Sequence, residues 1–151
     1  MDEKDIAILR NANIDYEDIT DRFEGNESLY LKLAELFLDD PHMPNVRKAF
    51  AAGDLATAEV EAHALKGVAG NLSLTNVHKL AKSMNDALRE GDETAATKLL
   101  PELDEAYAKA VEALREVLGK ERVKTRTRNA NATPNNKAGR IAAKATRPAF
   151  V

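Results

Sequence analysis

His63 lies in a stretch, HALKGVAGNL, whose residue types could support group transfer. If this stretch is helical, the neighbours of position 63 on its own face are the residues three, four and seven positions away. These residues are Glu59, Lys66, Gly67 and Gly70. A neutral imidazole is a nucleophile toward an acyl phosphate, and with an ordinary pKa of about 6.5 a histidine is mostly neutral at pH 7. His63 could therefore accept a phosphoryl group without an additional base.

The two charged neighbours have different expected effects on such a reaction. Lys66, one turn further along, could place its ammonium beside the incoming phosphoryl oxygens as a charge-assisted donor. Glu59 would repel those oxygens unless its carboxylate turns away or orients the ring. Taken alone, a lysine three residues from a histidine is more often a solvated surface pair.

Two glycines on the same face allow two interpretations. A glycine inside a helix is less stable than alanine by roughly 1 kcal/mol, so helix stability does not favour Gly67 or Gly70. The absence of side chains there would flatten the surface beside His63 and let a partner approach the ring. The alternative is that the glycines permit close helix packing or begin an early helix end.

The surrounding sequence predicts an all-α fold. Hydrophobic residues make up 44% of the chain and aromatic residues only 5%, which suits helices better than sheets. Apolar periodicity predicts short helical segments at 2–10, 15–23 and around 46–50, and long helices at 26–38, 54–72, 75–88 and 93–118. Short turns between the long helices favour an up-and-down antiparallel four-helix bundle.

The position of His63 relative to the core follows from the apolar stripe of the 54–72 helix. That stripe passes through Ala62, which lies about 100° around the helix from His63. We therefore expect the imidazole to project from the edge of the core face into solvent, where another protein can reach it.

Charge divides the chain into an acidic body and a basic tail. Residues 1–118 hold 13 Lys and Arg against 24 Asp and Glu, and residues 119–151 hold nine basic residues against Glu121 alone. We expect one domain over 1–118 and a disordered tail over 119–151, because the tail lacks sustained periodicity. The tail could be a solvated extension, a contact for nucleic acid or anionic membrane, or a remnant of a longer chain. We favour the first and expect no nucleic-acid contact, since aromatic residues are not interleaved.

Other classes of protein are disfavoured by composition. The chain has no cysteine and therefore no disulfide or thiolate site, and no run approaches the ~18 apolar residues of a membrane span. We expect a soluble, unprocessed cytoplasmic protein. No metal site is expected, because the core stripes lack carboxylates and paired Glu-x-x-His patterns. His42 and His78 are expected at the surface.

The stretch from His63 to Leu72 resembles the signature of histidine-containing phosphotransfer (HPt) domains. That signature has a histidine, then Lys and Gly at the third and fourth positions, then a second Gly at the seventh. The segments NIDYEDITDRFEGNESLYLKLAELF, FAAGD and ALREGD are also similar to the family, so the resemblance covers about residues 13–118. The chain departs from the family at Ser73, where many members have glycine, and at Asn85, where a glutamate is common. These departures concern the helix connection and surface hydrogen bonds.

The resemblance implies a function and a set of partners. It implies that His63 is the phosphoacceptor, labelled on Nε2 by the aspartyl phosphate of a receiver domain, and that it passes the group on in a phosphorelay. The domain would be a phosphocarrier with no kinase or ATP site, no metal and no cofactor of its own, since the receiver supplies the magnesium. Response-regulator receiver domains and a hybrid sensor kinase are the implied partners of a monomer.

We predict that the receiver docks on a surface formed by Glu59, Gly67 and Gly70 together with the apolar 26–38 helix. In that helix Leu31 and Leu38 are the leucines expected to remain partly exposed. The alternative is that the N-terminal segment covers both leucines, through apolar residues at Ile6, Leu9, Ile19 and Phe23.

Two other functions compete with the phosphocarrier. A helical bundle that binds signalling partners without being phosphorylated would be free to lose the histidine, so the intact set of His63, Lys66 and Gly67 favours the carrier. The transfer domain of a chemotaxis-type sensor kinase would be followed by an ATP-binding region, and none follows here.

Overall fold

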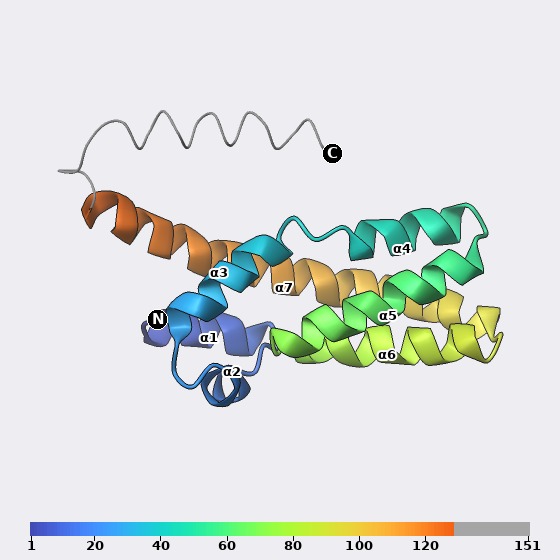
Figure 1. Ribbon diagram of the computed structural model, residues 1–151, viewed down its shortest axis with the longest axis horizontal. Helices are drawn as coiled ribbons and strands as arrows, with labels where there is room; N and C mark the ends of the chain where they lie inside the picture. The colour runs from blue at the N-terminus through green and yellow to red at the C-terminus, as the bar shows by residue number, and fades with distance from the viewer. Residues whose placement is uncertain (129–151) are drawn as a thin grey trace. The chain divides into compact units, whose positions relative to one another are not determined.

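The computed structural model describes the backbone of residues 1–128 and the side chains of residues 1–119. Over this part of the chain there are seven helices and a single isolated bridge between Ile14 and Leu74, so the all-α prediction is confirmed. The helices are α1 (Glu3–Asn11), α2 (Tyr16–Arg22), α3 (Glu27–Phe37), α4 (His42–Ala51), α5 (Leu55–Asn71), α6 (Thr75–Arg89) and α7 (Glu93–Arg128), labelled in Figure 1.

Short polar side chains begin several of these helices. Asp15, Asn26 and Asp54 each accept a hydrogen bond from the backbone N–H three residues later, as their sequence positions predicted. The prediction that Thr75 caps the next helix is wrong, because Leu74 occupies the cap of α6 without a side-chain bond and Thr75 is the first helical residue.

Helices α4, α5, α6 and α7 run side by side as a bundle with short connections (Figure 1). The sequence prediction treated α4 only as a short segment and counted α3 among the four long helices. Helix α4 is ten residues long, with Pro41 at its N-cap and Pro44 in its first turn. Neither proline interrupts the helix, because the backbone N–H groups of the first turn have no acceptor within the helix. Helix α3 instead packs on the bundle, as its tyrosine and phenylalanine contacts show.

The contacts of α3 reach two helices that are distant in sequence. The Tyr30 hydroxyl donates to the Leu72 carbonyl oxygen at the end of α5 over 2.8 Å, and the Phe37 ring lies 5.6 Å from the Tyr107 ring of α7. The rings of Phe23 and Tyr30 pack in an edge-to-face arrangement, with centroids 5.3 Å apart. Tyr30 is fully buried, so α3 joins the core at its tyrosine side.

The end of α7 differs from the prediction. The helix was expected to end at Leu118 but continues to Arg128, because Gly119 lowers helix stability without removing a backbone hydrogen bond. The chain divides into one compact unit, Met1–Leu118, and a second, Gly119–Val151. The predicted disorder of residues 119–151 is therefore wrong for 119–128, which continue α7, while residues 129–151 lie outside the described part of the chain.

No helix among the described residues is long and apolar enough to cross a membrane.

The core of the first unit is built from one face of each helix. In α5 the buried side chains are mostly small, at Ala58, Ala62, Leu65 and Ala69. Small side chains on this face let the neighbouring backbones approach closely, and the opposite face of α5 is left to solvent.

Candidate functional site

His63 lies on the solvent-exposed face of α5, as the apolar stripe predicted. One turn before it Val60 is 66% exposed, and one turn after it Gly67 is exposed with no other atom near. Within the described part of the chain no side chain is hydrogen-bonded to the His63 imidazole. Both ring nitrogens are therefore available to an approaching group.

Lys66 supplies the nearest cation of the same helix. Its side chain is half-buried and forms no ion pair among the residues that the structure describes. An ammonium without a carboxylate partner can neutralise a phosphoryl group placed on the next turn. The role of Lys66 beside a phosphoryl group remains a prediction from the sequence.

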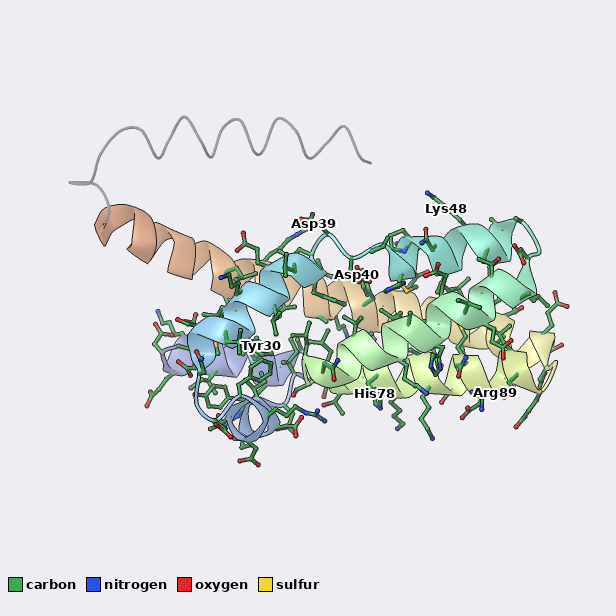
Figure 2. All side chains as sticks on the ribbon, in the orientation of Figure 1. Tyr30, Asp39, Asp40, Lys48, His78 and Arg89 are labelled. Atoms are coloured by element: carbon green, nitrogen blue, oxygen red, sulfur yellow. The ribbon has the colours of Figure 1, made fainter. Side chains whose placement is uncertain are left out.

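Glu59 contacts α6 through both its backbone and its carboxylate. The buried Asn85 amide donates to the Glu59 carbonyl oxygen over 3.1 Å and accepts from the Arg89 guanidinium over 2.9 Å. Arg89 Nε in turn lies 3.9 Å from Glu59 Oε1, and Figure 2 shows Arg89 on α6. The carboxylate is attracted to Arg89, so Glu59 does not orient the imidazole. Asn85, at a position where the resemblance led us to expect glutamate, therefore links the two helices from inside.

The two glycines turn out to have different surroundings. A Cβ added at Gly67 would meet nothing within 4 Å, whereas one added at Gly70 would lie 2.9 Å from His78 Nδ1 and 3.2 Å from His78 Cε1. The idea that Gly70 clears the approach of a partner is therefore wrong in this structure, because the ring of His78 fills that space. Close helix packing, the alternative that the sequence left open, explains Gly70, while Gly67 remains an open position beside His63.

His78 itself was expected at the surface but is partly buried between α5 and α6 (Figure 2). Its Nδ1 donates to the Lys66 carbonyl oxygen over 2.9 Å, which fixes the tautomer with the proton on Nδ1. The bond fastens α6 to the backbone of Lys66, three residues after His63 on α5. Periodicity alone gave no signal for this contact.

His42 was also expected at the surface and is likewise partly buried. Its Nδ1 lies 2.6 Å from Glu61 Oε2 of α5, and its backbone N–H donates to Asp40 Oδ2 over 3.1 Å. Glu61 lies about 200° around α5 from His63, since successive residues differ by about 100°. Helix α4 is therefore fastened to the side of α5 opposite the exposed imidazole. The described residues contain no cluster of three or more His, Cys, Asp or Glu able to hold a metal ion.

Helix α3 presents leucines to solvent, but not primarily those that were expected. Leu31 and Leu38 are partly buried and pack against the core, whereas the leucines with most exposure are Leu29 at 43%, Leu33 at 38% and Leu36 at 60%. The buried side of α3 is centred on Tyr30, Ala34 and Phe37. Leu31 and Leu38 follow Tyr30 and Phe37 directly and therefore lie at the edge of this buried side, whereas Leu29, Leu33 and Leu36 face solvent.

Ser73 occupies a left-handed turn between α5 and α6, with φ at 59°. Such a conformation strains a residue with a Cβ and favours glycine. The Ser73 hydroxyl donates to Asp18 Oδ2 over 2.7 Å, and the Ser73 carbonyl oxygen accepts from the Asp15 N–H over 3.0 Å. The segment around α2 thus holds the turn at a position where the resemblance led us to expect glycine.

Comparison with known proteins adds one finding. The family model described as the Hpt domain matches residues 32–116. This range runs from α3 to α7 and contains the whole of α5. No curated protein and no solved structure matches the chain.

Proposed function

The chain belongs to the Hpt domain family, and on that premise we propose that His63 accepts a phosphoryl group from a receiver-domain aspartyl phosphate and passes it to another receiver. Domains of this family serve phosphotransfer in two-component systems, interact with receiver domains of response regulators, and carry phosphate rather than act as kinases. The observation that most supports the proposal is the exposed, unpartnered imidazole of His63 at the family's histidine position.

The proposed transfer forms one bond and breaks one. The lone pair of His63 Nε2 attacks the phosphorus, the aspartyl P–O bond breaks, and the receiver recovers a free carboxylate. Reversal of these events on a second receiver returns the imidazole to its neutral form. Lys66 stabilises the phosphoryl oxygens once they leave the receiver, and we propose that magnesium and the acidic pocket stay with the receiver. The chain would then need no cofactor of its own.

We propose that the receiver docks over Gly67 and Val60, on either side of His63. The open space at Gly67 admits the receiver's loops, and Val60 is one of four exposed large apolar side chains among the described residues. The other three are leucines of α3, at Leu29, Leu33 and Leu36. They support α3 as a further receiver contact, while Leu31 and Leu38 can contribute only their exposed edges. We propose a monomer that works with these receivers in the cytoplasm.

The decisive experiment uses a receiver carrying labelled phosphate on its aspartate. Incubation with the full chain should give acid-labile, alkali-stable label on this protein, and His63→Gln should abolish it. His42→Gln and His78→Gln are matched controls that should retain the label. Label that persisted in His63→Gln would overturn the site assignment. Binding without any transfer from the receivers of the same organism would favour a bundle that binds partners without being phosphorylated.

A further inference from the structure

A groove between α4 and α7 gathers hydrogen-bond donors that the phosphotransfer site does not use. It has a volume of about 440 Å³ and is lined by Arg47, Tyr107, Ala108, Val111, Glu112 and Arg115. This volume lies within the range of about 300–1,000 Å³ usual for small-molecule sites. The α4 side of α5 is opposite His63, so the groove and the imidazole lie on different faces of the bundle.

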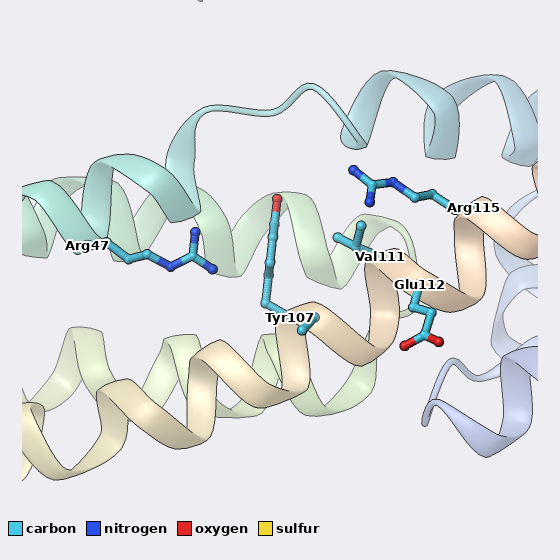
Figure 3. Close-up of a pocket in the computed structure, with 6 residues that line it drawn as sticks. Arg47, Tyr107, Val111, Glu112 and Arg115 are labelled. Atoms are coloured by element: carbon cyan, nitrogen blue, oxygen red, sulfur yellow. The ribbon is translucent and has the colours of Figure 1, made fainter.

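The two arginines reach the groove from opposite ends. Figure 3 shows the guanidinium of Arg47, on α4, beside the Tyr107 ring, and that of Arg115, on α7, on the other side of the ring near Val111. Arg47 is held in place, because its Nε donates to Asp104 Oδ1 over 2.5 Å and its guanidinium lies 5.7 Å from the centre of the Tyr107 ring. Neither contact uses its terminal nitrogens. Arg115 forms no hydrogen bond or ion pair within the described residues.

Tyr107 adds a third donor between the arginines. Its hydroxyl has no hydrogen-bond acceptor among the described residues. Burial raises the pKa of this hydroxyl, Asp40 raises it further, and the charges of Arg47 and Arg115 oppose the rise. The phenol therefore stays protonated at neutral pH and can donate.

The nearby carboxylates do not occupy the groove. Asp104 is bound to Arg47 Nε, and Asp40 accepts from the backbone of His42. Glu112 lines the groove but directs its carboxylate away from the two guanidiniums in Figure 3. The groove thus has two cationic ends and a phenol donor, with Val111 and Ala108 as an apolar middle.

We propose that this groove binds a small dianion, with one acidic group on Arg47, one on Arg115 and a short apolar or planar body over Val111. A guanidinium fork matches the two oxygens of a carboxylate or phosphate. We take the ligand to be a small molecule because the groove volume of about 440 Å³ lies in the small-molecule range. Such a ligand bridges α4 and α7 and is independent of the phosphoryl group on His63.

The test follows backbone amide signals by NMR in the full chain during titration with glutarate. Acetate at twice the concentration supplies the same number of carboxylates and is the matched probe. We expect saturable shifts confined to Tyr107–Arg115 and the α4 amides around Arg47, with glutarate binding at least about tenfold more tightly than acetate, the equivalent of one charge-assisted hydrogen bond. Equal affinity for the two probes would overturn the two-ended site.

Variants locate the site on the chain. Arg115→Gln should weaken glutarate binding about tenfold, and it should fold normally because Arg115 is exposed and contacts no carboxylate. Arg10→Gln removes an arginine of α1 that pairs with Glu17 and should leave binding unchanged. Retention of full affinity in Arg115→Gln would refute the proposal. A titration with pyrophosphate in place of glutarate shows whether phosphoryl or carboxylate groups bind better. Tighter binding of glutarate than acetate, or of pyrophosphate than phosphate, supports the site.

Discussion

The immediate surroundings of His63 are simple, because no side chain of the described residues is hydrogen-bonded to the exposed imidazole. Glu59 is attracted to Arg89, and Gly67 contributes no side chain. This leaves Lys66 as the nearest charged group of α5 that can act on a phosphoryl group.

Lys66→Met should slow phosphotransfer to His63 by about tenfold or more, because one charge-assisted contact to the phosphoryl oxygens is lost. Lys66→Arg should retain most of the rate, since it keeps the positive charge. The measurement is single-turnover transfer from a phosphorylated receiver. Lys82→Met, which removes an exposed lysine of α6, serves as the control. Equal rates for Lys66→Met and the unmodified chain would show that Lys66 is only a solvated surface residue.

Gly70→Ala and Gly67→Ala should have opposite effects on stability. At Gly67 the added methyl meets open space, so the free energy of unfolding should rise by up to about 1 kcal/mol through helix propensity. At Gly70 the methyl meets the His78 ring, and overpacking of about 1–3 kcal/mol should outweigh that gain.

The His78→Ala background provides the control for Gly70. With the ring removed, Gly70→Ala should become stabilising, which urea denaturation of the four variants can measure as a double-mutant cycle. If Gly70→Ala had the same effect in both backgrounds, the steric account of Gly70 would fail. Gly67→Ala should also slow transfer despite its added stability, because it narrows the approach to His63.

At the scale of elements, the turn between α5 and α6 depends on α2. Ser73 adopts a left-handed conformation, and its hydroxyl is bound to Asp18. The bond to Ser73 and then that to Arg22 lower the pKa of the Asp18 carboxyl below its ordinary value of 3.8. A carboxyl with a lowered folded-state pKa stabilises the protein above its unfolded-state pKa, and this contribution is lost as the pH falls through the folded-state pKa.

Ser73→Ala should therefore lower the free energy of unfolding at pH 7, and the difference from the unmodified chain should shrink as the pH falls below the ordinary Asp18 value of 3.8. Ser73→Gly should be less harmful, because it loses the same bond but relieves the backbone strain. Thermal unfolding across pH 2.5–7, chosen as about one unit below to three above that value, measures both. Ser83→Ala, at an exposed serine of α6, should show no such pH dependence.

For the whole molecule, opposite charges are separated along the chain. The first 118 residues carry 13 basic and 24 acidic side chains, and the remainder carries nine basic residues and one acidic residue. The buried core described for the first unit ends at Leu118. We therefore expect folding and transfer to depend on the first unit.

Deletion of residues 129–151 should leave the unfolding midpoint within about 2 °C, because a change of 1 kcal/mol shifts it by about 2–8 °C in domains of about 60–250 residues. The rate of transfer to His63 should also be unchanged. Differential scanning calorimetry and the labelled-receiver assay are the measurements. A large fall in the midpoint would show that these residues pack on the first unit. Loss of nucleic-acid binding at moderate salt on deletion would instead support the electrostatic interpretation of the tail.

Local sequence determined the features that depend on one helix alone. The 3.6-residue period of α5 was enough to place His63 outside the core, and cap residues such as Asp54 predicted where helices begin. The same logic failed for α3, where the choice of the exposed leucines depends on which side Tyr30 and Phe37 bury. That choice is made by Leu72 and Tyr107, which lie more than 40 positions away in the chain.

Tertiary structure alone decided the contacts between helices. Three examples join residues whose sequence spacing carries no periodic signal. They are the contact of His78 with Gly70, the bond of Ser73 to Asp18, and the position of Arg47 and Arg115 on one groove. Periodicity states which way a side chain points from its own helix axis, but not which neighbour lies there. The histidine proposed as the phosphoacceptor could thus be selected from sequence, while the packing around it required the folded chain.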